Sequence, residues 1–133
     1  MYTDAEKKSY CVGLNCGISQ SNGDFILCLN DDVILDEKFI EKAIIGFTVS
    51  SKIGMVDGKV FRFDGITLDS TGLSLNLYRS VRERGYGTKK GQLYNRAGYI
   101  FGVSGAVAFY RRAMLEDLKM GVEYFDSDFR FFY

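Results

Sequence analysis

The chain has 133 residues, of which 47% are hydrophobic, so it is long enough for one domain with a core of its own. Its 17 basic and 17 acidic residues balance, which removes the electrostatic case for nucleic acid as the main partner. No histidine is present, which excludes the commonest general base and any histidine-based metal site. Three cysteines without paired spacing argue against a disulfide framework and a zinc site, and they favour a reducing, cytoplasmic compartment.

The first predicted element is a short helix around residues 13–20. Leu14 and Ile18 are four residues apart and give it one apolar edge, and Gly23 can end it. An α/β nucleotide-binding domain normally begins with a buried strand and a phosphate loop. Residues 1–10 are polar, show no clear period and match neither.

An apolar strand over residues 25–29 follows a strong turn signal and ends in polar residues. It leads into Asn30-Asp31-Asp32, whose oxygens suit Mg²⁺ or Mn²⁺. The carboxyl edge of an open α/β sheet is where ligands bind. The alternative is a solvated turn, because turns favour Asn and Asp in any case. The stretch therefore raises the hypothesis of a divalent-metal site for a phosphorylated ligand.

Residues 37–49 are predicted to form a helix that begins after an N-cap at Asp36. Its apolar residues recur at helical spacing and are expected to pack on the sheet as core: Phe39, Ile40, Ala43, Ile44 and Phe47. Residues 53–63 then predict a strand with a bend or bulge, and residues 67–77 a second extended segment.

Residues 79–98 carry six basic residues against one acid, Glu83. This pattern indicates a mobile loop that closes over phosphates or meets a phosphorylated or membrane-bound acceptor, or else a solvated loop that balances acids elsewhere. Residues 99–110 are expected to form a buried strand. The small residues Ser104-Gly105-Ala106 within it would let a ligand or another element approach the backbone closely.

A short helix is expected over residues 113–118. The longest apolar stretch, residues 97–110, is too short and too glycine-rich to span a membrane. Residues 124–133 contain six aromatic side chains, which would be an aggregation liability if exposed. We therefore expect the native polypeptide to continue past Tyr133, or this tail to be buried against a partner, with self-association as one result.

Several separated features stand in one order along the chain. They are Gly13-x-Asn15-x-Gly17, Gly23-Asp24, Asn30-Asp31-Asp32, Asp57-Gly58, Gly102-x-Ser104-Gly105-Ala106, Tyr110-Arg111-Arg112 and Phe125-Asp126. This ordered set resembles the family 2 glycosyltransferases of the GT-A fold, most closely the bacterial branch that includes rhamnosyltransferases and other cell-surface polysaccharide enzymes. The fold that it implies is α/β, a partial GT-A-like (Rossmann-like) sandwich with a mixed sheet flanked by helices, in a single domain over residues 1–133.

The resemblance also implies roles for particular residues. Asn30-Asp31-Asp32 looks like the family's DxD-type motif, with Asn in place of the first Asp. Asp32 would then reach a Mn²⁺ or Mg²⁺ that bridges the donor diphosphate, and Asn30 and Asp31 would lie near the donor ribose and the metal. Such an ion neutralises the charge that develops on a departing diphosphate. Ser104-Gly105-Ala106 matches the strand that lines the donor-sugar and acceptor cleft.

The resemblance is incomplete at both ends of the chain. Nothing matches the family's first strand and helix, which hold the nucleotide base. The family's general base belongs to an acidic pair that follows the aromatic run, and the sequence stops at Tyr133, where that pair would begin. Asp126 matches an earlier family position. The catalytic residue is therefore not identified. The chain is expected to be a domain truncated at both ends and, by itself, a weak or inactive catalyst, since the general base and the base-binding strand are missing.

The predicted function is metal-dependent, inverting transfer of a sugar from a nucleotide-diphosphate-sugar donor to a glycan or lipid-linked acceptor, as in polysaccharide biosynthesis. The expected location is the cytoplasm or the inner face of the membrane. One alternative is a nucleotidyltransferase with a similar metal-bound diphosphate, although such enzymes usually carry a glycine-rich phosphate loop near the start. Another is a non-catalytic binding or assembly module on the same scaffold.

Overall fold

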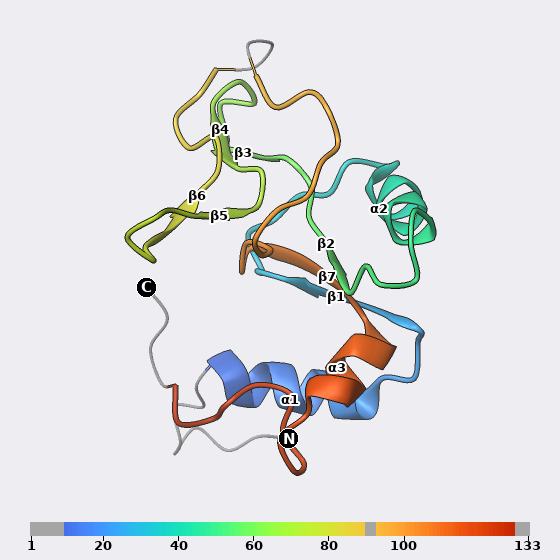
Figure 1. Cartoon of the computed structure of the whole chain (residues 1–133). Coiled ribbons are helices and arrows are strands. Elements are labelled where there is room, and N and C mark those ends of the chain that lie inside the picture. The colour runs from blue at the N-terminus through green and yellow to red at the C-terminus, as the bar shows by residue number, and fades with distance from the viewer. Residues whose placement is uncertain (1–9, 90–92, 130–133) are drawn as a thin grey trace. The chain divides into compact units, whose positions relative to one another are not determined.

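The computed structural model describes residues 10–89 and 93–129 (Figure 1). These residues combine helices with short strands, so the predicted α/β class is confirmed. The chain divides into two compact units, Met1–Ile26 with Arg111–Tyr133, and Leu27–Tyr110. The elements in chain order are α1 (Tyr10–Gln20), β1 (Phe25–Leu29), α2 (Phe39–Thr48), β2 (Met55–Val56), β3 (Val60–Phe61), β4 (Leu68–Ser70), β5 (Leu73–Leu75), β6 (Val81–Glu83), β7 (Val107–Arg111) and α3 (Arg112–Leu118).

The strands form three small sheets. One has the order β1-β7-β2, and β2 pairs antiparallel with β7, Val56 opposite Phe109. The other two are the antiparallel pairs β3–β4 and β5–β6. The predicted strand over residues 53–63 is therefore two strands in different sheets, β2 and β3, and the predicted basic loop contains a strand, β6.

Helix α2 begins later than the sequence predicts. The Asp36 carboxylate accepts a hydrogen bond from the Lys38 N–H (3.0 Å) and the Asp36 carbonyl accepts one from the Phe39 N–H (2.9 Å), so Asp36 forms a turn before the helix. Ala43 and Phe47 are buried as predicted, and the Phe47 ring meets the Phe109 ring edge-on at 5.4 Å.

The apolar face predicted for α2 is wider than the face that is buried. Ala43 and Phe47 are buried, whereas Ile40 and Ile44, which were also predicted as core, are exposed. The predicted strand over residues 99–110 is likewise too long, since β7 begins only at Val107. Ser104 cannot continue the strand, because its N–H bonds a side chain, the Asp57 carboxylate.

The smaller unit is tied together by polar side chains. The Arg112 backbone N–H donates to the Asp24 carbonyl (2.9 Å), and its guanidinium donates to the Gly23 carbonyl (2.5 Å) and the Ser21 hydroxyl (2.6 Å). These bonds fix the start of α3 to the turn that precedes β1. Arg112, the second arginine of the Tyr110-Arg111-Arg112 motif, therefore has a structural role.

The Asn15 side chain holds the segment that follows α3. Its Oδ1 accepts the N–H groups of Tyr124 (3.0 Å) and Phe125 (2.9 Å), and its Nδ2 donates to the Phe125 carbonyl (2.7 Å). The two aromatic side chains are half-buried. Residues 130–133, the rest of the predicted aromatic tail, lie outside the described residues, and whether the tail causes self-association stays a prediction.

Replacement of this amide is the first test. Asn15→Ala is expected to lower the free energy of unfolding by about 2 to 4 kcal/mol, because four hydrogen bonds of roughly 0.5 to 1 kcal/mol each are lost in a half-buried site, the fourth from Nδ2 to the Ser127 hydroxyl (3.3 Å). Ser19→Ala is the control, since its exposed hydroxyl bonds only its own helix, at the Cys16 carbonyl. Urea titration followed by circular dichroism measures both. Equal midpoints for the two variants would contradict the structural role of Asn15.

Candidate functional site

The turn after β1 presents the three polar residues that the sequence singled out. Asn30, Asp31 and Asp32 are all exposed, directly after the carboxyl end of β1. Within the strand, Ile26 and Cys28 are buried and alternate with less buried residues, so one face of β1 belongs to the core. The side-chain oxygens of Asn30, Asp31 and Asp32 therefore follow the end of a strand, as the sequence predicts.

A backbone hydrogen bond joins this turn to the second predicted site segment. The Asn30 N–H donates to the Ala106 carbonyl at 3.1 Å. Ser104-Gly105-Ala106 forms the turn before β7, with Ser104 buried, Ala106 half-buried and Gly105 exposed. The two segments are far apart in sequence and adjacent in space, within one compact unit.

Asp57 supports the turn at Ser104. One carboxylate oxygen accepts the Ser104 N–H at 2.6 Å, and the other accepts the Gly58 N–H at 2.7 Å. Burial, with a smaller contribution from the Glu83 charge, raises the pKa of Asp57 to about 6, against the lowering effect of the two backbone hydrogen bonds. Asp57 was part of the ordered motif set but had no assigned role; its spacing gave no hint of the contact with Ser104.

Glu83 is a second carboxylate near the same turn. It accepts a short hydrogen bond from the hydroxyl of buried Ser70 and a long one from the Ser104 hydroxyl (3.5 Å). Sequence reasoning missed Glu83, although a single acid within a basic stretch was a signal. Ser104 is thus bonded through its backbone to Asp57 and through its hydroxyl to Glu83.

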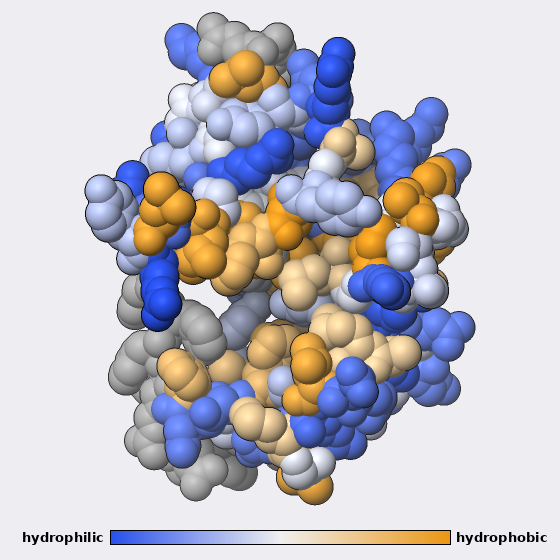
Figure 2. All heavy atoms as spheres, in the orientation of Figure 1, coloured by the Kyte–Doolittle hydropathy of each residue, from blue (hydrophilic) through white to orange (hydrophobic). Residues whose placement is uncertain are grey.

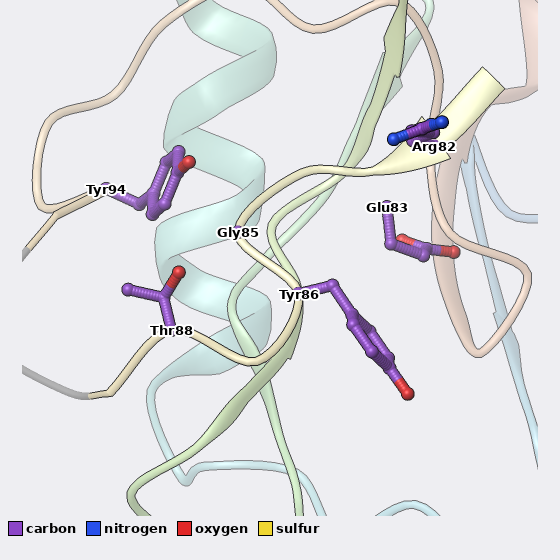
Figure 3. A pocket seen from close by; sticks show the side chains of 6 residues that line it. All are labelled: Arg82, Glu83, Gly85, Tyr86, Thr88 and Tyr94. Carbon is purple, nitrogen blue, oxygen red and sulfur yellow. The ribbon is translucent and has the colours of Figure 1, made fainter. Parts of the chain in front are cut away.

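Glu83 lines a pocket of about 500 Å³, and Figure 3 shows the residues that surround it. The Glu83 and Tyr86 side chains point to one side of the Gly85 backbone, and Thr88 and Tyr94 lie on the other. A second pocket of about 580 Å³ includes Asp57 and Arg84 in its lining. The Arg84 guanidinium lies 4.6 Å from the centre of the Tyr94 ring. Neither pocket is lined by Asn30, Asp31 or Asp32.

The described carboxylates of the candidate site do not by themselves form a metal site. Among the described residues, no three Asp, Glu, Cys or His side chains are grouped so that they could hold an ion. Mg²⁺ and similar ions are commonly held by one or two carboxylates with substrate phosphates completing the shell. Asp31 and Asp32, both exposed, have carboxylate oxygens of the kind that this arrangement with substrate phosphates requires.

Comparison with known proteins gives one finding. A family model described as glycosyl transferase family 2 matches residues 2–119. That range includes Asn30-Asp31-Asp32, Asp57, Glu83 and Ser104-Gly105-Ala106. Searches of curated proteins and of solved structures return no match. Within the part of the chain that the structure describes, no helix is long and apolar enough to cross a membrane.

Proposed function

This chain belongs to glycosyltransferase family 2, and on that premise we propose that it transfers a sugar from a nucleoside-diphosphate sugar to a glycan or lipid-linked acceptor. The observation that carries the proposal is the hydrogen bond from the Asn30 N–H to the Ala106 carbonyl, which joins the two segments that the family resemblance assigns to one cleft. The proposal includes the bacterial rhamnosyltransferase-like branch and polysaccharide biosynthesis. The three cysteines, Cys11, Cys16 and Cys28, are an odd number without paired spacing, which favours a reducing compartment.

The proposed roles follow from the chemistry of the side chains. Asp32, helped by Asp31, would hold Mn²⁺ or Mg²⁺, which would supply positive charge to the diphosphate leaving group. Asn30 and Asp31 would contact the donor, and the small Gly105 and Ala106 would leave room for the sugar beside the backbone. The acceptor hydroxyl would attack the anomeric carbon from the face opposite the diphosphate, which inverts the configuration, and its proton would pass to a carboxylate base.

No described acid is assigned as that base. Asp57 uses both carboxylate oxygens to accept backbone N–H groups, so its visible role is to position Ser104. Glu83 is bonded to the Ser70 and Ser104 hydroxyls.

Donor binding gives the direct test of the metal assignment. Asp32→Asn keeps the shape of the side chain and removes its charge, so UDP or dTDP affinity in the presence of Mn²⁺ is expected to fall at least about tenfold, or roughly 1.4 kcal/mol. Asp117→Asn is the matched control, because Asp117 is also an exposed acid and lies on α3. Calorimetric titration with and without Mn²⁺ measures both variants.

An unchanged affinity of Asp32→Asn would remove the metal assignment. Transfer of a sugar to an acceptor by the unaltered chain would exclude the binding-module alternative. Release of pyrophosphate from a nucleoside triphosphate and a sugar phosphate would favour a nucleotidyltransferase.

A further inference from the structure

The loop that joins β5 to β6 is a tightly bonded turn. The Asn76 side-chain oxygen accepts the N–H groups of Tyr78 and Ser80, each at 3.0 Å. The Asn76 N–H donates to the Ser80 carbonyl (3.1 Å), and the Asn76 carbonyl accepts the Arg79 N–H (3.0 Å). Below the turn the strands pair in register, with Leu75 opposite Val81. The backbone of this hairpin end is therefore held in one conformation.

This ordered turn holds apolar side chains in water. Leu77 is 100% exposed and Tyr78 is 92% exposed, and Leu75 and Val81 are exposed at the ends of the strands below them. Figure 2 shows hydrophobic and hydrophilic spheres side by side where Figure 1 draws the end of the β5–β6 hairpin. Four apolar side chains are thus exposed together at the end of one hairpin, which makes this end a candidate interaction site.

The charges around the turn are positive. Arg79 and Arg82 are exposed, and Arg79 has a φ of 57°, so the turn adopts a left-handed conformation at a non-glycine residue. Glu83 is the one acid in residues 73–83, and it accepts hydrogen bonds from Ser70 and Ser104. The hairpin end therefore presents two arginines without a local acid to neutralise them, and it complements a negatively charged partner.

The shape of the turn decides between kinds of partner. A stable protein interface buries roughly 800 Å² on each side. Two side chains at the end of a narrow hairpin cannot supply such an area, but they can enter the interfacial layer of a bilayer. There, binding combines buried apolar area with attraction to anionic lipids, and tyrosine rings prefer the headgroup level.

We propose that the end of the β5–β6 hairpin, residues 75–82, docks onto an anionic lipid bilayer. Leu77 and Tyr78 enter the interfacial layer, and Arg79 and Arg82 contact the lipid phosphates. This contact would hold a glycosyltransferase at the surface where lipid-linked acceptors lie. The docking surface shares no residue with Asn30-Asp31-Asp32, so failure of this proposal would leave the proposed donor site unaffected, and the reverse is also true.

Vesicle flotation of the full chain tests the proposal. The chain is expected to float with vesicles of phosphatidylcholine and phosphatidylglycerol and to remain free with phosphatidylcholine alone. The double variant Leu77→Ser, Tyr78→Ser should bind at least about tenfold more weakly. The double variant Arg79→Gln, Arg82→Gln should lose about fivefold for each arginine at low salt. Phe63→Ser is the control, because Phe63 is 88% exposed on another hairpin, beside Asp64.

A fluorescence reporter locates the contact, because the chain contains no tryptophan. Tyr78→Trp should shift its emission to the blue when anionic vesicles are added, whereas Phe63→Trp should not. Absence of flotation with anionic vesicles, or equal binding by the Leu77→Ser, Tyr78→Ser variant, would overturn the proposal. So would a self-associating chain that this variant renders monomeric, because the occupant would then be a second copy. Titration with UDP and Mn²⁺ should be the same for the Leu77→Ser, Tyr78→Ser variant as for the unaltered chain.

Discussion

Gly72→Ala is expected to lower the free energy of unfolding by about 3 kcal/mol. Gly72 is buried and has a φ of +94°, a conformation that costs an L-residue about 1 to 2 kcal/mol. An added Cβ would also lie 2.7 Å from Cδ1 of Ile100 and 3.2 Å from the Gly102 carbonyl oxygen. Relief of such overpacking costs roughly 1 to 3 kcal/mol more.

Gly72→Ala should also disturb the candidate site. The Gly72 N–H donates to the Ser70 hydroxyl (3.1 Å), and the Gly72 carbonyl accepts the Arg84 N–H (2.8 Å). Ser70 in turn bonds Glu83, which is also bonded by Ser104. A shift of the backbone at Gly72 is therefore expected to disturb the support of the Ser104 turn.

Gly65→Ala separates backbone strain from crowding. Gly65 has a similar positive φ, +68°, but nothing lies within 4 Å of its added Cβ. This control should lose only about 1 kcal/mol, the conformational part alone. Denaturant titration measures both variants, and equal losses would show that Ile100 moves away without cost.

The free energy of unfolding is expected to rise by up to about 3 kcal/mol as the pH falls from 7 to 4, through protonation of Asp57. Burial raises the pKa of Asp57 from 3.8 to about 6, so in this interval the folded state binds the proton that the unfolded state has lost. A tenfold difference in proton affinity between the two states corresponds to about 1.4 kcal/mol. The stabilisation is complete below pH 4 and is lost as the pH rises through 6.

Asp57→Asn should remove this slope between pH 4 and 6, because the amide does not titrate there. Asp69→Asn is the control: its exposed carboxylate pairs with Arg62 at 3.3 Å, and the slope should remain. Asp64 acts in the opposite direction and at lower pH. Hydrogen bonds from Thr67 and Ile66 lower its pKa to about 2, so its contribution is lost only as the pH falls below 4. A slope in Asp57→Asn equal to that of the unaltered chain would refute the assignment to Asp57.

Local patterns were sufficient where one segment decides its own conformation. The apolar run ending in Asn30-Asp31-Asp32 becomes β1 and an exposed turn, and the predicted helix over residues 113–118 is α3 with one more residue at its start. Helix α1 also ends where Gly23 suggested, near Gln20. Hydrophobic periodicity and turn residues act over a few residues, so they are readable without knowledge of the rest of the chain.

Long-range contacts decided the remainder. The predicted strand over residues 99–110 begins too early, because the Ser104 N–H bonds the Asp57 carboxylate. The predicted buried face of α2 is too wide, because only part of the helix surface is covered by the rest of the fold. Strand β6 of the β5–β6 hairpin lies in a stretch whose basic composition indicated a loop.

By itself, the sequence determined the α/β class, the family resemblance and the polar turn after β1. Only the tertiary structure decided that Asn30 lies beside Ala106, that Asp57 and Glu83 support Ser104, and that Leu77 and Tyr78 stand exposed on a bonded turn. The physical reason is that burial and hydrogen bonding between distant residues depend on which surfaces pack together. The periodicity of residues along the sequence describes one segment at a time and does not specify which segments pack together.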